Sequence, residues 1–288
     1  MLKQMIKRAT EMLTSGEVQQ VLAWKKGDFP YYPEPAFFAK PEDLQDMVYD
    51  KFCSANLSKY MAKNDIKRTL VFLRPCDAYG FNQLLKENQI KRESAYIIGV
   101  GCDGCVAVDE GQELGLLEAC RVCTKTTFPV YDELIEAEAA TRQAADKDLR
   151  FAEVNRLEAL APAERYAFWR QQLSKCMRCN ACRNICPTCH CKKCVFDNQT
   201  YDTPQKANVT PFEEQMFHII RAYHVAGRCT DCGQCSRACP QGIPLQLLNR
   251  KFIKDINNMY GEFQAGENFE APGPLTSFDI QGDPEVSG

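Results

Sequence analysis

Two stretches of the chain share one unusual cysteine spacing: CMRCNACRNICP at residues 176–187 and CTDCGQCSRACP at residues 229–240. Each follows the pattern C-x2-C-x2-C-x3-C-P. In this spacing three thiolates on one tight loop reach three corners of a 4Fe-4S cube, and the fourth thiolate points to a neighbouring cube. A single copy would also suit structural zinc, but two copies in one chain favour a pair of 4Fe-4S clusters.

The repeated spacing predicts two crossed ligand sets. The first cluster would take Cys176, Cys179, Cys182 and Cys239. The second would take Cys229, Cys232, Cys235 and Cys186. Because each set borrows one thiol from the other motif, ligation would lock the two halves of this region together.

The composition of the chain excludes several classes of protein. It has 288 residues, 17 of them cysteine, with 45% apolar and 25% charged residues and a net charge of -3. This is typical of a folded globular protein and excludes a strongly basic nucleic-acid binder. No apolar run approaches the roughly 20 residues of a membrane span. The amino terminus lacks a secretory signal, so we expect a cytoplasmic protein in which metal ligation, not disulfide formation, uses the thiols.

The cysteines divide the chain unevenly, with six before residue 176 and eleven between residues 176 and 239. In the first part, residues 69–73 and 95–100 are short apolar runs that predict buried strands, and residues 77–88 have helical spacing. Strand, helix and strand in this order predict a parallel sheet. We expect further helices to begin at Pro41 and Asn56, and an irregular segment around the prolines at 30, 33 and 35.

Four regions follow from these patterns. Residues 131–174 are rich in Glu, Ala, Arg and Leu and predict helices, one of which begins at Pro162. A further helix is expected over about residues 244–260, before a polar tail. The predicted regions are an α/β domain with a cysteine metal site (1–135), a helical linker (136–174), a two-cluster ferredoxin-like α+β domain (175–260) and an extended tail (261–288).

Three more cysteines follow the first motif directly: Cys189, Cys191 and Cys194. They could be core thiols, zinc ligands or three ligands of a third cluster, and their crowding favours ligation. The fourth ligand must then come from elsewhere, and Cys53 is the candidate, with Cys76 as the alternative. His190 is more typical of a neighbour that forms hydrogen bonds than of a ligand.

The remaining cysteines of the first domain suggest another metal site. Cys102 and Cys105 form one C-x2-C pair, and Cys120 and Cys123 form a second one 14 residues further on. This arrangement alone would suit zinc. Cys76 and Cys102 follow the two predicted parallel strands, whose carboxyl ends face the same crevice. We therefore expect a site that holds either zinc or a fourth cluster and has the ligands Cys76, Cys102, Cys120 and Cys123, with Cys105 as the alternative to Cys76.

Several segments together carry a family resemblance. They are FCSANL (52–57), PCDA (75–78), GCDG (101–104), CRVC (120–123) and AGRC (226–229), together with the two ferredoxin motifs. From about residue 37 to the tail, the chain resembles the iron-sulfur beta subunits of deazaflavin-reducing hydrogenases and formate dehydrogenases. Similar chains accompany heterodisulfide-reductase-like, electron-bifurcating complexes of strict anaerobes.

The resemblance implies an electron conduit inside a larger anaerobic oxidoreductase complex. Such a subunit would relay single electrons between other redox subunits, including a flavin subunit, and would have no catalytic residues or substrate site of its own. It would hold at least two 4Fe-4S clusters, and three or four if the other cysteines also bind iron. The alternative is a beta subunit that itself holds a flavin and oxidises or reduces a hydride carrier. Residues 99–104, GVGCDG, have the glycine spacing G-x-G-x-x-G, but this short pattern alone is weak evidence, and we do not expect a flavin.

Overall fold

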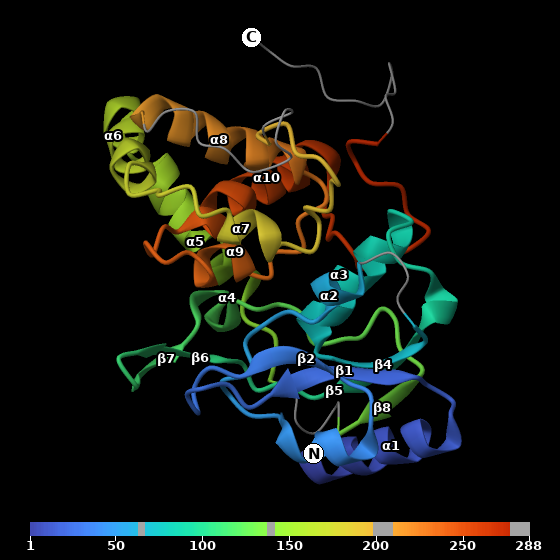
Figure 1. Cartoon of the computed structure of the whole chain (residues 1–288). Coiled ribbons are helices and arrows are strands. Elements are labelled where there is room, and N and C mark those ends of the chain that lie inside the picture. Colours follow the sequence, from blue (N-terminus) through green and yellow to red (C-terminus); the bar gives the residue numbers. More distant parts are fainter. Residues whose placement is uncertain (63–66, 137–141, 198–209, 277–288) are drawn as a thin grey trace. The chain divides into compact units, whose positions relative to one another are not determined.

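The computed structural model describes residues 1–62, 67–136, 142–197 and 210–276. Their contacts divide the chain into two units, which are described separately (Figure 1). The first unit comprises Met1–Lys147 together with the short segment Gly266–Phe269. The second comprises Asp148–Ala265 and the described residues from Glu270 onward.

The first unit contains all the strands of the described chain. The strands are β1 (Gln20–Lys25), β2 (Glu34–Phe38), β3 (Met47–Val48), β4 (Thr69–Leu73), β5 (Ala95–Val100), β6 (Val106–Asp109), β7 (Gln112–Leu116) and β8 (Glu133–Ile135). The helices are α1 (Leu2–Ser15), η1 (Pro41–Asp46), α2 (Ser58–Met61), α3 (Pro75–Lys86), η2 (Arg92–Ser94) and α4 (Glu118–Arg121). Both η elements are 3-10 helices, so the helix expected at Pro41 is a tighter turn than an α-helix.

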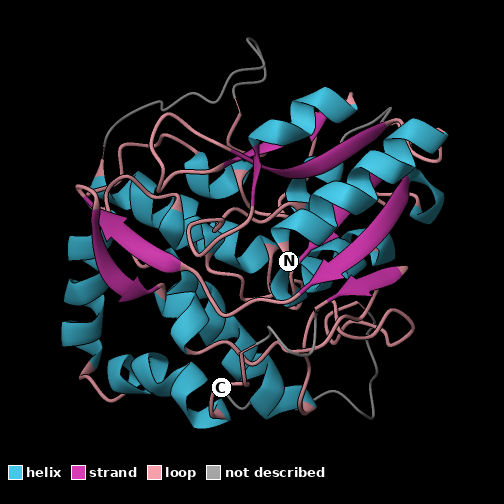
Figure 2. Cartoon of the chain, turned by 90° about the horizontal axis from the view of Figure 1, so that it is seen from below, coloured by secondary structure: helices cyan, strands magenta, loops and turns pink. Residues whose placement is uncertain are grey.

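The main sheet has the strand order β2-β1-β4-β5-β8, with β3 also paired to β1. Figure 2 shows the strands of the chain in magenta. Strands β1, β4, β5 and β8 run parallel, while β2 and β3 are antiparallel to β1. The predicted parallel pair is confirmed, and it lies in register with Val71 opposite Ile97. The expectation of an irregular segment around Pro35 is wrong, because β2 includes this residue. A proline is tolerated there because β2 is an edge strand.

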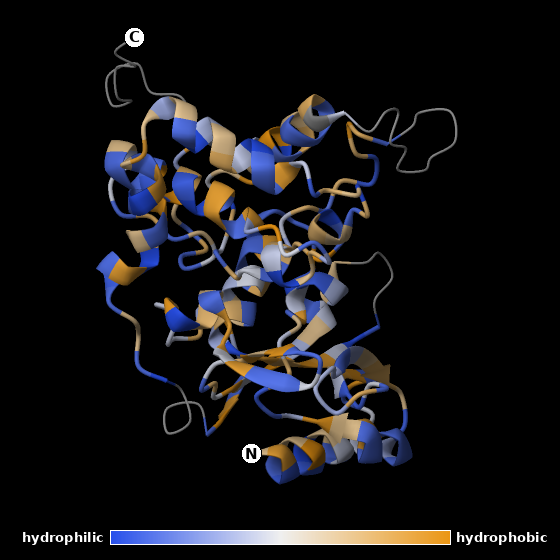
Figure 3. Ribbon diagram, turned by 90° about the vertical axis from the view of Figure 1, so that its left-hand side faces the viewer, coloured by the Kyte–Doolittle hydropathy of each residue, from blue (hydrophilic) through white to orange (hydrophobic). Residues whose placement is uncertain are grey.

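The core of the first unit lies on both faces of the sheet. Strand β4 is buried along its whole length. Met5 of α1, Leu22 of β1 and Phe81 of α3 belong to the same apolar core. Figure 1 shows α1 and α3 on opposite sides of the sheet, and Figure 3 shows the hydrophobic strands between them. Covered on both faces, the central strands are continuous apolar runs.

The second unit is helical in its described residues. Its helices are α5 (Lys147–Glu158), α6 (Pro162–Leu173), α7 (Ala181–Asn184), α8 (Pro211–His224), α9 (Gln234–Arg237) and α10 (Leu245–Tyr260). Pro162 begins α6, as expected, but β8 lies where helix was predicted after residue 131. Helix α8 packs against α6 and α10, and α9 packs against α7 and α10. No strand is assigned between residues 175 and 260 in the described part of the chain, so the β component expected there is not seen.

Small apolar clusters hold the helices of the second unit together. Leu173 of α6 and Phe217 of α8 share one cluster with two of the cysteines. Val154 of α5 packs against Leu247 of α10 in another. Within the described chain, no helix is both long enough and apolar enough to cross a membrane.

Part of the predicted tail is fixed on the first unit. The side-chain amide of Asn82 in α3 donates to the Gly266 carbonyl at 2.9 Å, and the Tyr79 hydroxyl lies 3.5 Å from the Glu267 carboxylate. The last part of the predicted tail, residues 277–288, lies outside the described residues.

Candidate metal centres

The two cysteine motifs form loops with the same backbone pattern. In the first loop, Arg178 and Asn180 have left-handed φ angles of 52° and 60°. In the second, Asp231 and Gly233 at the equivalent positions have φ angles of 56° and 70°. In both loops, the residue two positions after the first cysteine donates its backbone N–H to the sulfur of that cysteine. Arg178 donates to Cys176 at 3.3 Å, and Asp231 donates to Cys229 at 3.4 Å. The repeated sequence therefore produces two loops with the same local conformation.

The first predicted ligand set is brought together within the second unit. Burial raises the pKa of the Cys176 thiol to about 12, and the nearby Cys182 thiol contributes to the rise. Burial also raises the pKa of Cys182, and Cys239 and Cys179 add to that rise. Thiols influence one another in this way only at short range. Cys239, from the second motif, therefore lies with the thiols of the first motif.

The second predicted set is brought together in the same way. Burial raises the pKa of Cys229 far above its usual value, and the Asp231 carboxylate and the Cys186 and Cys232 thiols raise it further. Burial raises the pKa of Cys235 to about 11, with contributions from Cys186 and also from Cys182 of the first predicted set. The thiols of the two motifs therefore lie close together, and the crossed division into two ligand sets stays a prediction.

Helix α8 contributes charged and polar residues that the cysteine spacing could not indicate. Glu214, His218 and Arg221 are all buried on one face of this helix. One potential ligand atom each of Cys176, Glu214 and His218 lie within 4.8 Å of one another. Burial lowers the pKa of His218 to about 3, so its imidazole is neutral at pH 7. The signal in the sequence was the helical spacing of these three residues, but it says nothing about which neighbours they face.

The second loop is held by buried ion pairs. Arg150 of α5 contacts the Asp231 carboxylate at 2.9 Å, and Arg250 of α10 contacts it at 3.1 Å. Arg150 also donates to the Gln264 side chain at 2.9 Å. The first loop has the opposite charges, because Arg178 pairs with Glu214 at 3.0 Å.

The cysteines after the first motif are not gathered as clearly. Cys189 and Cys194 are half-buried, and Cys191 is exposed. The backbone N–H of Cys194 donates to Asp197 at 2.9 Å, and Arg183 holds the same carboxylate. His190 forms a 2.8 Å hydrogen bond with Arg228, as a neighbour would.

Cys53, the predicted fourth ligand of that site, lies in the other unit. Its side chain is fully buried in the apolar core of the first unit, and its Sγ atom accepts a 3.3 Å hydrogen bond from the backbone of Asp50. The described contacts do not join it to Cys189, Cys191 or Cys194.

The first unit gathers the thiols of a further site at the carboxyl ends of β4 and β5. Burial raises the pKa of Cys76, followed by Asp77, and the Cys102 and Cys123 thiols add to this rise. The Cys120 thiol accepts a 3.3 Å hydrogen bond from the backbone of Cys105. All four cysteines predicted for this site therefore lie close together.

Cys105, the predicted alternative to Cys76, belongs to the same group. Its thiol interacts with those of Cys102 and Cys120, which lower and raise its pKa respectively. Arg74 donates to the Cys105 sulfur at 3.0 Å. The Arg74 guanidinium is itself fixed by Asp77 at 2.8 Å and lies over the Trp24 ring.

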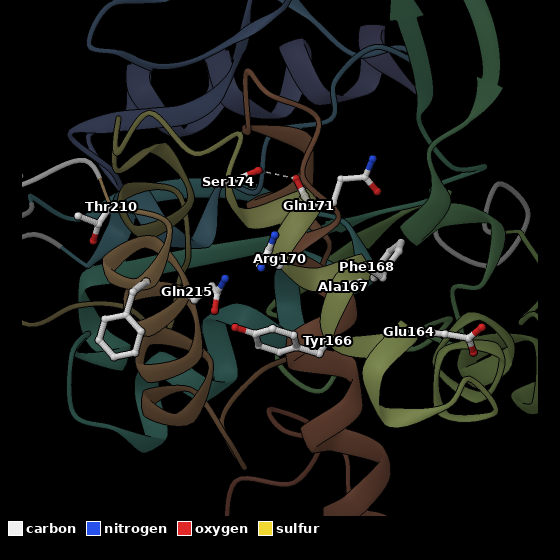
Figure 4. Close-up of a pocket in the computed structure, with 10 residues that line it drawn as sticks. Glu164, Tyr166, Ala167, Phe168, Arg170, Gln171, Ser174, Thr210 and Gln215 are labelled. Atoms are coloured by element: carbon white, nitrogen blue, oxygen red, sulfur yellow. Dashed lines mark hydrogen bonds between the residues drawn. The ribbon is translucent and has the colours of Figure 1, made fainter.

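A groove of about 1200 Å³ between α6 and α8 lies apart from the cysteine chemistry. Figure 4 shows Tyr166 and Arg170 of α6 pointing toward Gln215 of α8 across it. Its lining residues are Glu164, Tyr166, Ala167, Phe168, Arg170, Gln171, Ser174, Thr210, Phe212 and Gln215. No cysteine is among them, so this groove has no direct part in binding iron.

Comparison with known families supports the interpretation of the second unit. Residues 172–243 match the family described as a 4Fe-4S dicluster domain. The chain carries a 4Fe-4S dicluster domain. All eight cysteines of the two predicted ligand sets lie inside the matched residues of this dicluster domain.

Similar proteins cover most of the chain. An F420-dependent formate dehydrogenase subunit beta from Methanocaldococcus jannaschii is 22% identical over 88% of this chain and 89% of its own length. An F420-dependent formate dehydrogenase 1 subunit beta from Methanococcus maripaludis is 23% identical over 92% and 90%. A succinate dehydrogenase iron-sulfur subunit from Bacillus subtilis is 26% identical over 50% and 58%. All three are named as subunits of dehydrogenases.

Proposed function

We propose that this chain is an iron-sulfur electron-transfer subunit that relays single electrons between other redox subunits of an oxidoreductase complex. The observation that carries the proposal is that the thiols of both motifs lie close together inside one dicluster domain. When bound, 4Fe-4S clusters supply one-electron chemistry at potentials between about -700 and +450 mV. The similarity to formate dehydrogenase beta subunits supports partner subunits for this chain as well.

The residues of the dicluster domain fit two clusters chemically. Each set offers four thiols, which is the ligand number of a 4Fe-4S cluster. Burial raises the pKa values of Cys176, Cys182, Cys229 and Cys235, so without metal these four thiols stay protonated at neutral pH; metal binding displaces such protons. The first cluster would bind to Cys176, Cys179, Cys182 and Cys239, and the second to Cys229, Cys232, Cys235 and Cys186.

Two further metal sites belong to the proposal. Cys76, Cys102, Cys120 and Cys123 would hold a fourth cluster or zinc, and Cys105 could replace one of them because it lies between Cys102 and Cys120. Cys189, Cys191 and Cys194 would supply three ligands of a third cluster. The assignment of Cys53 to that third cluster stays a prediction without a supporting contact.

Electrons must enter and leave near exposed parts of the clusters. Cys179 in the first loop is exposed, and so is its neighbour Met177. Cys191 is exposed as well, close in sequence to the exposed Val195. An apolar residue beside an exposed ligand is suited to a docking surface, so we propose that partner redox subunits bind at these two places.

A flavin-containing beta subunit is the second candidate function. The observation in its favour is that two similar proteins are named as F420-dependent. Acid precipitation of the purified chain would release a yellow flavin into the supernatant if this function were correct, and a colourless supernatant would contradict it.

The proposed function is tested by metal analysis and by cysteine substitution. The anaerobically purified chain should contain about eight or more irons and equal sulfide for its 4Fe-4S clusters. Zinc in place of iron would overturn the proposal. The EPR spectra of the reduced variants C179S and C232S then identify the signal of each cluster.

If the ligands are crossed, substitution of the last cysteine of each motif should affect the cluster bound by the other motif. C239S should disturb the same EPR signal as C179S, and C186S the same signal as C232S. If C239S instead disturbs the signal lost in C232S, the ligands are not crossed. The two last-cysteine variants are matched controls, because each removes one thiol at the same position of its motif.

A further inference from the structure

We propose that Arg221 is a tuning residue shared by both clusters of the dicluster domain, with its guanidinium donating N–H groups to sulfur atoms at both sites. The inference rests on the proposed two-cluster function and assigns a role to a residue outside both cysteine motifs.

Arg221 lies on the face of α8 that meets the cysteines. Phe217, one turn earlier on the same helix, is buried in one apolar cluster with Cys182 and Cys235. Residues four apart on a helix share a face, so Arg221 is directed toward the same region. Its side chain is only 3% exposed. The cysteines in this cluster come one from each motif, which places Arg221 near both sites.

The electrostatic neighbours of Arg221 agree with this position. Burial lowers the pKa of its guanidinium, but four nearby thiols outweigh this and raise it. These thiols belong to Cys235, Cys182, Cys186 and Cys189. Cys182 belongs to the first predicted set, while Cys235 and Cys186 belong to the second.

No protein acceptor in the described chain satisfies the Arg221 guanidinium. Its Nε, Nη1 and Nη2 atoms are buried and have no hydrogen-bond partner among the described residues. The other three buried arginines each contact a carboxylate: Arg74 contacts Asp77, and Arg150 and Arg250 contact Asp231. A buried cation without a partner is strongly destabilising, so these donors require acceptors that bind with the metal.

Cluster sulfur provides such acceptors. A guanidinium has five N–H donors in a rigid fork, enough to reach sulfur atoms at two sites. Reduction adds negative charge to a cluster, and a buried cation stabilises that charge with little screening by salt. Hydrogen bonds to sulfur are among the factors that set cluster potentials. Arg221 should therefore raise the reduction potentials of both clusters.

The experiment compares R221Q and R221K with the wild-type chain, and R170Q serves as a control that removes an exposed arginine charge on α6. Iron and sulfide are measured first, and EPR-monitored redox titrations then give the midpoint potential of each cluster. R221Q should shift both potentials downward, R221K should shift them less, and R170Q should leave both unchanged.

Other results would overturn the shared role. If R221Q has full iron content and unshifted potentials, Arg221 does not tune the clusters, and a shift at one cluster alone shows that it is not shared. If the R221Q chain does not assemble its clusters, the R221K chain provides the test, because lysine keeps the positive charge but lacks the planar guanidinium. Unchanged potentials at both clusters of R221K would then contradict the proposal. A wild-type chain that contains no iron would instead overturn the proposed function itself.

Discussion

At the scale of single residues, the buried arginines connect the fold to the metal sites. Arg74 joins three parts of the first unit, because its guanidinium donates to Asp77, to the Ala55 carbonyl and to the Cys105 sulfur. The Asp77 carboxylate is fully buried. A buried pair of this kind contributes little net stability over an apolar pair, but removal of one partner leaves a buried charge without compensation.

R74L should therefore destabilise the first unit by about 3–5 kcal/mol, because it leaves Asp77 unpaired. K25Q is the control, since Lys25 forms an exposed pair with Asp46 at 3.7 Å and its loss should cost less than about 0.5 kcal/mol. Urea unfolding followed by Trp24 fluorescence in a W169F background gives both values. An R74L variant as stable as K25Q would show that Arg74 does not compensate the Asp77 charge.

At the scale of secondary-structure elements, α8 lies between the two cysteine motifs in the sequence and packs against α6 and α10. The Phe217 ring lies 4.1 Å from the Arg178 guanidinium and meets the Phe196 ring edge to face, with 4.9 Å between the ring centroids. Phe212, on the same helix, is 68% exposed. The inner face of α8 therefore supports the first cysteine loop, and its outer face does not.

F217A should destabilise the second unit by about 3–5 kcal/mol, the usual cost of removing a buried aromatic side chain. F212A removes the same side chain from the exposed face and should change stability by less than about 0.5 kcal/mol. Urea unfolding followed by far-UV circular dichroism compares the two. Equal effects of the two substitutions would mean that the face of α8 assigned to the core is wrong.

How well the sequence predicted these elements depends on how many residues carry the pattern of each one. Strands β4 and β5 were predictable because each is a continuous apolar run bounded by polar residues, as buried parallel strands are. Strand β8 has three residues and leaves no periodicity to detect. The two cysteine motifs could be recognised from local spacing. The position of Arg221 could not be predicted, because it depends on which distant segments pack against α8.

At the scale of the whole molecule, the chain passes through its first unit twice. After α10, the segment Gly266–Phe269 rejoins the first unit and lies against α3. A methyl group on Gly266 would meet the Tyr79 carbonyl oxygen at 2.0 Å. The close approach of these two backbones therefore requires glycine.

G266A should weaken the attachment of this segment and destabilise the first unit more than G16A does. Gly16 has nearly the same left-handed φ angle, 74° against 76°, but a methyl group there would meet nothing within 4 Å. G16A should thus show only the backbone cost of about 1–2 kcal/mol. Urea unfolding measures both, and limited proteolysis should cut the G266A chain between α10 and residue 276 more rapidly. Equal losses of stability would show that the close contact with Tyr79 is unimportant.

Opposite charges at one position distinguish the two repeated motifs. Arg178 pairs with Glu214, whereas Asp231 at the equivalent position pairs with Arg150 and Arg250. Gene conversion that copied the first repeat over the second would place a third arginine beside Arg150 and Arg250, and the reverse copy would place two carboxylates together. Either product would bury like charges without partners. The DNA that encodes one repeat therefore cannot overwrite the other without a large loss of stability, although the two share the same cysteine spacing.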